Sequence, residues 1–155
     1  MARVHVRSWQ VTYQGLLPQD YLDGLTPEDW ASRYTFGRNE PEMAATVVAV
    51  DEGVVCGFAS TCPSRDHDLP DFAELWMLYV DPHRCGEGIG RLLIAAARDR
   101  MRQTGAHEAL LWVADKNERA RRFYQSDGWR AEDLTVQRTF GGVLVGMVRY
   151  RCALI

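Results

Sequence analysis

The middle and the end of the chain hold short segments rich in β-branched and other apolar residues. Turn-forming residues, such as Asp51-Glu52-Gly53 and Gly141-Gly142, separate neighbouring segments. We therefore predict β-strands at residues 45–51, 54–62, 72–80, 109–114, 131–140 and 143–153. The first two and the last two should form hairpins. Segment 72–80 is the most apolar and should lie in the centre of a sheet.

Helical spacing is clearest in residues 89–103. The apolar side chains there fall on one stripe, made of Ile89, Leu93, Ala97 and Met101. Residues 117–126 indicate a shorter helix that stops at Gly128. The first 36 residues are also expected to be helical. Within them, Thr26-Pro27 suits a helix start, and that helix should end near Gly37.

These elements follow one another as helices, β, β, β, α, β, α, β, β. A doubly wound fold would need strict alternation of strand and helix, which this order lacks. The pattern therefore predicts an α/β fold with a mixed sheet. The 155 residues fit one domain, 1–155, with a sizeable core.

Composition and charge narrow the class of protein. With 46% hydrophobic and 25% charged residues, the chain is typical of a globular domain. Its net charge of -3 does not indicate a nucleic-acid binder, and no apolar run approaches the roughly 20 residues that span a membrane. The N-terminus lacks the apolar core of a signal peptide. The four cysteines form no CxxC pair and no zinc-like spacing with histidine. We expect a cytoplasmic protein with reduced thiols and no metal.

Three glycines, Gly86, Gly88 and Gly90, lie between the strand 72–80 and the helix 89–103. Glycine lets the backbone come close to a ligand, and free N–H groups at a helix start bind anions. A phosphate or pyrophosphate is therefore predicted at residues 86–91. The segment lacks the Gly-Lys-Ser/Thr of a P-loop and the G-x-G-x-x-G of a dinucleotide site. The alternative is a turn that only redirects the chain.

Two segments resemble the GNAT superfamily of N-acetyltransferases. Leu78-Tyr79-Val80-Asp81-Pro82, followed by Gly88-Ile89-Gly90-Arg91-Leu92-Leu93, is similar to the family's acetyl-CoA signature, (Arg/Gln)-x-x-Gly-x-(Gly/Ala). Residues 117–129 resemble the family's Asn-x-x-Ala-x-x-Phe-Tyr-x-x-x-Gly-Phe. The resemblance runs from about Val47 to Trp129. It implies the GNAT acyl-CoA acyltransferase fold, and transfer of an acetyl group from acetyl-CoA to a primary amine.

The resemblance also implies which residues bind acetyl-CoA. Its pyrophosphate would lie on the backbone of the turn, formed by Cys85, Gly86, Glu87, Gly88, Ile89, Gly90 and Arg91. The backbone of Leu78, Tyr79 and Val80 would hold the pantetheine arm and polarise the acetyl carbonyl, where this strand separates from its neighbour near Asn117. Asn117 would contact the cofactor, cap the following helix, or do both. This chain has Cys85 where the family has Arg or Gln. The contact that the Arg or Gln side chain makes with the cofactor is therefore lost or comes from Arg84.

Two side chains are candidates for proton transfer. Tyr124 falls at the position where many family members carry a general acid for the departing sulfur. Glu74 precedes Gly88 at the spacing of the glutamate that serves as base in the family's histone acetyltransferases. A buried carboxylate in an apolar strand suits proton acceptance. The alternatives are a core tyrosine and a solvated glutamate. Other family members use a glutamate on the next strand, where this chain has Trp112.

The acceptor site should lie between the N-terminal helices and the strand ends. Four aromatic residues are candidates for its lining or for the core: Trp9, Tyr13, Trp30 and Tyr34. Three loop acids, Asp66, Asp68 and Asp71, either attract a cationic amine or are simply solvated. We expect a small-molecule amine as acceptor. The alternatives are a protein N-terminus or lysine, or a non-catalytic CoA-binding regulatory module.

The N-terminal segment differs from the family's pattern. Family members usually open with a β-strand, whereas this chain begins with residues expected to be helical, so the usual first strand is expected to be missing. An uncovered sheet edge invites pairing with another chain. We therefore expect a homodimer with symmetric contacts through the C-terminal strands.

Overall fold

A computed structural model describes residues 1–34 and 45–154 of the chain. Six strands form one sheet in the order β1-β2-β3-β4-β6-β5. Their bounds are β1 (Ala45–Asp51), β2 (Val54–Pro63), β3 (Ala73–Val80), β4 (Glu108–Ala114), β5 (Arg130–Phe140) and β6 (Val143–Ala153). Neighbours are antiparallel except β3 and β4, which are parallel. The predicted strands and the mixed sheet are confirmed, with ends that differ by at most one residue.

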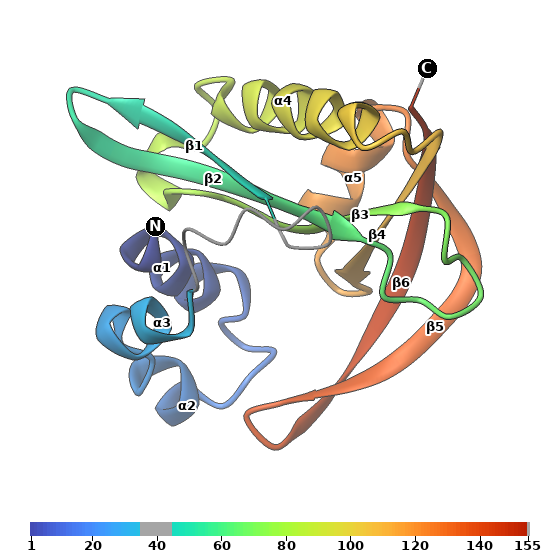
Figure 1. The fold of residues 1–155 in the computed structure, drawn as a ribbon. Helices are drawn as coiled ribbons and strands as arrows, with labels where there is room; N and C mark the ends of the chain where they lie inside the picture. The colour runs from blue at the N-terminus through green and yellow to red at the C-terminus, as the bar shows by residue number, and fades with distance from the viewer. Residues whose placement is uncertain (35–44, 155) are drawn as a thin grey trace.

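Helices cover both faces of the sheet (Figure 1). They are α1 (Ala2–Thr12), α2 (Gln19–Asp23), α3 (Pro27–Arg33), α4 (Ile89–Gln103) and α5 (Glu118–Ser126), with a short 3₁₀ turn, η1 (Pro82–Arg84). Helices α4 and α5 lie on one side of the sheet, and α1 to α3 lie on the other (Figure 1). Among the described helices, none is long and apolar enough to cross a membrane.

Local sequence explains where these helices begin and what they bury. The Thr26 side chain accepts a hydrogen bond from the Asp29 N–H at 3.2 Å, and Pro27 occupies the first helical position of α3. Helix α3 ends at Arg33, and the predicted end near Gly37 lies outside the described residues. In α4 the predicted stripe is buried against the sheet.

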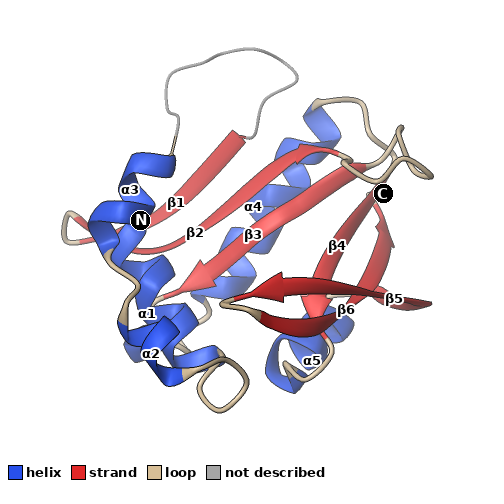
Figure 2. Ribbon diagram, turned by 90° about the horizontal axis from the view of Figure 1, so that it is seen from below, coloured by secondary structure: helices blue, strands red, loops and turns tan. Residues whose placement is uncertain are grey.

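Strands β3 and β4 separate soon after they begin. They pair only at Ala73 with Ala109 and at Glu74 with Leu110. Beside this point β3 carries a bulge, since Leu75 pairs with Thr61 and Met77 with Ser60, which leaves Trp76 as an extra residue. In Figure 2 the two strands diverge towards their carboxyl ends. One edge of β3 therefore has no strand partner from Trp76 to Val80.

Candidate active site

A cleft of about 830 Å³ occupies the space where β3 and β4 separate. At one end it is lined by the glycine turn and α5, and at the other by α1, α3 and the β5–β6 hairpin. Of the residues predicted to bind the cofactor, all line this cleft except Glu87, whose side chain pairs with Arg84. Both predicted catalytic residues, Glu74 and Tyr124, line it as well. Residues separated by up to 50 positions in the sequence thus meet in one cavity.

The glycine turn leaves the start of α4 open. Gly86 and Gly88 have φ angles of +96° and +84°, a conformation that residues with a side chain rarely adopt. Gly88 is the N-cap of α4, and no side chain caps the helix or places an acid in its first turn. In the described part of the chain, the N–H groups of residues 86–90 donate to no other backbone group. The turn therefore offers consecutive donors and a helix dipole to an anion.

Open space lies above the same turn. A Cβ atom added at Gly86 or Gly88 would have no other atom within 4 Å. Gly90 is different, because a Cβ there would lie 3.4 Å from the Phe123 ring of α5. Gly86 and Gly88 thus fit close approach of a ligand, whereas Gly90 also fits close packing of two helices.

Arg84 is held beside the turn by two carboxylates. Its Nε lies 2.6 Å from Glu87 Oε2, and its Nη2 lies 3.0 Å from Asp51 Oδ2. These hydrogen bonds raise the pKa of the guanidinium, which stays charged. Arg84 lines the cleft, as do Arg91 and Arg119. Three cations therefore surround the end of the cleft where the turn lies.

Helix α1 is fastened to the free edge of β3. Ser8 Oγ donates a hydrogen bond to the Val80 carbonyl oxygen at 3.0 Å, and Trp9 Nε1 donates to the Tyr79 hydroxyl at 3.0 Å. Burial raises the pKa of Tyr79, so this hydroxyl keeps its proton. These contacts fix the wall of the cleft opposite α5.

Tyr124 is buried, yet its hydroxyl faces the cleft. The side chain of Tyr124 packs edge-on against Phe123 and Trp129. Its hydroxyl makes no hydrogen bond to a described residue, and no fully buried polar side-chain atom in the described chain lacks a partner. The hydroxyl must therefore reach the space of the cleft. Burial, and to a lesser degree Tyr13, raises the pKa of Tyr124, so the phenol is protonated at neutral pH.

Asn117 caps helix α5. Its side-chain oxygen accepts a hydrogen bond from the Ala120 N–H at 3.1 Å, which confirms the predicted cap. Asn117 also lines the cleft, and the amide nitrogen of its side chain remains available to a ligand. Contact with the cofactor stays a prediction.

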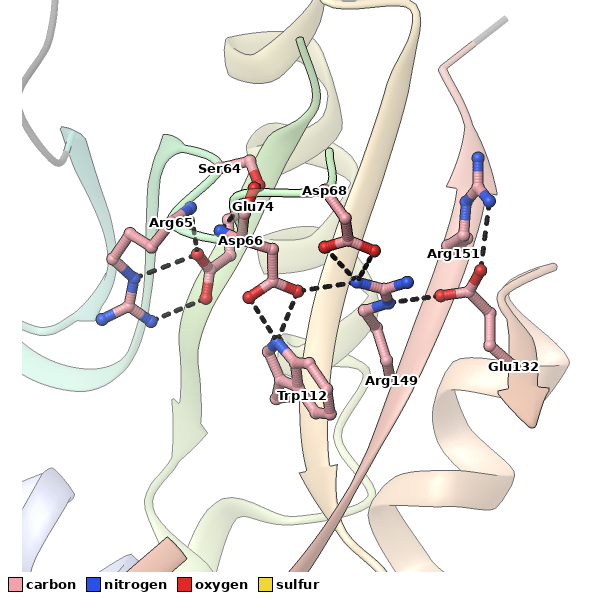
Figure 3. Close-up of polar contacts among 9 residues, drawn as sticks. All are labelled: Ser64, Arg65, Asp66, Asp68, Glu74, Trp112, Glu132, Arg149 and Arg151. Carbon is pink, nitrogen blue, oxygen red and sulfur yellow. Dashed lines mark hydrogen bonds and ion pairs between the residues drawn. The ribbon is translucent and has the colours of Figure 1, made fainter. Parts of the chain in front are cut away.

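Glu74 lies where β3 and β4 begin to separate, and it is paired with Arg65. Only 2% of its side chain is exposed. Its Oε1 lies 2.6 Å from Arg65 Nη2, and its Oε2 accepts from Arg65 Nε at 3.0 Å and from the Arg65 backbone N–H at 3.2 Å. Figure 3 shows this fork-like pair. Glu74 is therefore buried as predicted, but it is a member of an ion pair rather than an isolated carboxylate.

The end of the cleft away from the turn is aromatic. We call it the aromatic chamber; its rings are Trp9, Tyr13, Tyr21, Trp30, Trp76, Trp112 and Phe140. Tyr34 does not line the cleft but lies 2.7 Å from His5 Nδ1. His5 stacks on Tyr79 with ring centroids 4.4 Å apart, and burial lowers its pKa to about 4. Three of the four aromatic residues predicted for the acceptor site thus line the cavity.

Of the three loop acids that were candidates for attracting an amine, Asp66 and Asp68 bind other residues, and Asp71 does not line the cleft. Asp66 accepts hydrogen bonds from Trp112 Nε1 at 3.1 Å and from Arg149 Nη1 at 3.1 Å, and Asp68 pairs with the same arginine at 2.9 Å. Arg149 also pairs with Glu132, and only 7% of its side chain is exposed. Figure 3 shows Asp66 and Asp68 directed at Arg149. Neither acid lines the cleft. The network holds the loop between β2 and β3 against β4 and β6.

Several lining residues escaped the sequence analysis, among them Arg65, Arg138 and His5. Arg65 and Arg138 lie in a polar loop and on a strand with many polar positions, and neither belongs to a motif. His5 lies in an N-terminal helix whose apolar pattern is mixed. Only the tertiary contacts bring them to the cavity, so no local signal could have identified them.

An uncapped helix start beside two parallel strands that separate is the site expected of an acyl-CoA-dependent acyltransferase. The sequence profile of the Acetyltransferase (GNAT) family matches residues 6–129. The chain belongs to this family of N-acetyltransferases.

Similar proteins agree with this assignment. The chain is 33% identical over 118 residues to the uncharacterized N-acetyltransferase YuaI of Bacillus subtilis, covering 76% of this chain and 66% of that protein. It is 25% identical over 130 residues to a spermidine N(1)-acetyltransferase of Thermoplasma acidophilum, covering 81% of this chain and 78% of that protein. Two mycothiol acetyltransferases that it matches are much longer, since the matches cover 35% and 33% of their lengths.

Solved structures share the fold. The PaiA N-acetyltransferase of Thermoplasma acidophilum, in complex with coenzyme A, is similar with a TM-score of 0.68 at 22% identity. The alignment covers 96% of this chain and 88% of that chain. A GCN5-related N-acetyltransferase from Rhodopseudomonas palustris has a TM-score of 0.72 at 21% identity, over 98% of this chain and 86% of that chain. The GNAT fold predicted from the two motifs is confirmed.

Proposed function

We propose that this chain is an acetyl-CoA-dependent N-acetyltransferase that acts on a primary amine of a small molecule. One observation carries the proposal. The uncapped start of α4 and the unpaired edge of β3 open into the same cleft, which Glu74 and Tyr124 also line. Donors for a pyrophosphate, an edge for an extended amide chain, and two groups for proton transfer are thus combined in one cavity.

The turn and β3 would bind acetyl-CoA, which supplies an activated acetyl group as a thioester. The N–H groups of residues 86–90 would hold its pyrophosphate, with Arg84 and Arg91 adding positive charge. The polar groups on the free edge of β3 would pair with the pantetheine amides and polarise the thioester carbonyl. Cys85 replaces the family's Arg or Gln, so backbone donors would do most of this work.

Tyr124 and Glu74 would handle the protons of the reaction. The amine nitrogen bonds to the carbonyl carbon, the carbon–sulfur bond breaks, and the sulfur leaves with the bonding electrons. The protonated Tyr124 hydroxyl would donate to that sulfur. Glu74 would accept the proton that the amine loses, either directly or through a water molecule. Arg65 would keep the Glu74 carboxylate oriented toward the cleft.

The size of the aromatic chamber favours a small molecule as the acceptor. The aromatic chamber is bounded by α1, α3 and the β5–β6 hairpin, and it belongs to a cleft of about 830 Å³ that must also admit the end of acetyl-CoA. One relative is named for acetylation of spermidine, which is a small amine. Small amines fit a chamber of this kind better than a folded protein does.

Release of CoA thiol from acetyl-CoA tests the proposal. The wild-type protein should release CoA with some small amines of a broad panel and not without amine. Glu74→Gln should lower kcat by roughly 100- to 10,000-fold and keep the fold, because Arg65 is half exposed and can be solvated when the charge is removed. Glu108→Gln, at an exposed carboxylate of β4, is the matched control. Binding of acetyl-CoA without turnover of any amine would instead indicate a regulatory module, and turnover of peptides alone a protein acetyltransferase.

A further inference from the structure

The charged side chains of the aromatic chamber are almost all cationic. Arg33, Arg65 and Arg138 line this end of the cleft. Glu74 is the single carboxylate among all the described residues that line the cleft. The other lining arginines, Arg84, Arg91 and Arg119, lie in η1, α4 and α5. Arg84 is already paired with Asp51 and Glu87, and phosphates of CoA would neutralise Arg91 and Arg119. A surplus of positive charge therefore remains on the acceptor side.

The one carboxylate does not offset this surplus. Both oxygens of Glu74 accept hydrogen bonds from Arg65, so the pair is neutral as a whole. The nearby acids Asp66, Asp68 and Glu132 do not line the cleft, and their carboxylates are directed at Arg149 and Arg151 (Figure 3). Arg33 and Arg138 remain, and within the described residues neither forms an ion pair.

Arg138 is held in place by an indole ring instead of a carboxylate. Its guanidinium carbon lies 5.1 Å from the centre of the Trp112 ring. Trp112 is fixed in turn, since its Nε1 donates to Asp66 and Arg149 lies 5.7 Å from the ring centre. A guanidinium over an aromatic face keeps the N–H donors along its edge free for a ligand. The half-buried Arg138 thus presents a pre-oriented fork of donors to the chamber.

Arg33, at the end of α3, has the same arrangement. Its guanidinium carbon lies 4.9 Å from the centre of the Trp30 ring. Because Arg33 is exposed, water screens its charge more than that of Arg138. Arg138 is therefore the stronger binding group of the two.

We propose that the acceptor is an amine that carries a carboxylate, and that Arg138 binds this carboxylate. The inference rests on the proposed acetyl transfer and names the acceptor class. Planar carboxylates match the arginine fork in a bidentate way. The apolar rings of the chamber would receive an aromatic or aliphatic side chain, so the acceptor resembles an amino acid. A polyamine such as spermidine would place extra positive charge beside Arg33 and Arg138, which form no ion pair with a described residue, and this is unfavourable.

Matched pairs of amines test the inference with the intact protein and acetyl-CoA. L-Tryptophan and tryptamine differ only in the carboxylate, as do L-phenylalanine and phenethylamine. We expect kcat/KM for the carboxylate-bearing member to exceed that of its partner by 10-fold or more, and spermidine to be poorer still. Equal or better turnover of tryptamine, phenethylamine or spermidine would overturn the inference and leave acetyl transfer standing. No CoA release with any amine would overturn the proposed function, and the inference with it.

A variant links the preference to Arg138. Arg138→Gln should lower kcat/KM for the preferred carboxylate-bearing amine by roughly 10- to 100-fold, the loss typical of a charged hydrogen-bond partner, and change that of the decarboxylated amine less than about 3-fold. The decarboxylated amine reports whether the variant is folded. Arg100→Gln, at an exposed arginine of α4, should change neither. An equal loss for both amines in Arg138→Gln would refute carboxylate binding by Arg138.

Discussion

Burial alters the proton affinity of side chains that line the cleft, among them Tyr79, Tyr124 and His5. The pKa values of Tyr79 and Tyr124 are raised because the phenolate form loses its hydration, and the pKa of His5 is lowered to about 4 because the imidazolium form does. At neutral pH both tyrosines are therefore protonated and His5 is neutral. Tyr13 shares this state and also lines the cleft, so protonation does not distinguish Tyr124. What distinguishes Tyr124 is its place on α5, where the neighbouring Phe123 ring packs beside Gly90 of the turn.

Replacement of Tyr124 by Phe should slow the reaction without weakening cofactor binding. The variant keeps the ring that packs on Phe123 and Trp129 and removes only the donor. We expect kcat to fall by roughly 10- to 1000-fold, since a thiolate is itself a tolerable leaving group. Steady-state kinetics gives kcat, and calorimetric titration gives the acetyl-CoA affinity. A wild-type kcat in Tyr124→Phe would remove this hydroxyl from the mechanism.

The buried His5 should make folding stability depend on pH. Its pKa is about 4 in the folded protein and about 6.5 when unfolded, so the unfolded chain binds more protons between these values. Its contribution to stability is therefore complete above pH 6.5 and is lost as the pH falls toward 4. At pH 5 the loss is roughly 2 kcal/mol.

Urea unfolding at pH 7.5 and pH 5 measures this dependence. In a His5→Gln variant the difference between the two unfolding free energies should shrink by about 2 kcal/mol, even though the variant is less stable at both pH values. Replacing the exposed His83 by Gln should leave the difference as it is in the wild type. An unchanged difference in His5→Gln would show that His5 does not titrate with the fold.

At the scale of elements, the junction between η1 and α4 determines the anion site. Asp81 caps η1 through its side chain, which accepts a hydrogen bond from the His83 N–H at 3.0 Å. No side chain caps α4 in the same way. The longer helix therefore keeps its N-terminal donors for a ligand.

A bulky residue at Gly88 should abolish cofactor binding, because its side chain would occupy the space that a pyrophosphate needs. Gly88→Val should weaken acetyl-CoA binding by at least about 10-fold while the protein stays folded. Gly105→Val is a matched control, since Gly105 has a φ of +86° and equally open surroundings but lies at the other end of α4. Both variants carry the same backbone strain. Equal acetyl-CoA affinity in the two folded variants would contradict the assignment.

At the scale of the whole molecule, the two C-terminal strands form one side of the described sheet. β5 is an edge strand, paired only with β6. Leu144 on β6 is 67% exposed, and Leu134 on β5 is 36% exposed. Exposed leucines beside an open strand edge favour contact with another chain.

We predict a homodimer through these strands at micromolar concentration. Light scattering after gel filtration should give twice the mass of the chain, and Leu144→Glu should shift the protein toward the monomer because it buries a charge in the contact. Val54→Glu, at a residue that is 67% exposed on the opposite side of the sheet, should leave the dimer intact. A wild-type monomer would refute the prediction.

The sequence by itself determined the elements and the anion-binding turn. The strands, the stripe of α4 and the cap of α3 depend on contacts between near neighbours, such as Thr26 with Asp29, so local spacing was sufficient. The same holds for the turn, because the φ angles at Gly86 and Gly88 and the free N–H groups are properties of a few consecutive residues. The two motifs identified the family, and the resemblance to that family predicted that β3 separates from β4.

The tertiary structure alone decided how charge is distributed around the cleft. The sequence presented Glu74 as a candidate base and the loop acids as candidates to attract an amine. In the folded chain Arg65 pairs with Glu74. Arg149, which lies more than 80 positions after Asp66 and Asp68 in the sequence, pairs with both of them. Arg138 lies over an indole ring and forms no ion pair with a described residue. Such pairings depend on which side chains meet across the sheet, and a one-dimensional pattern does not contain that information.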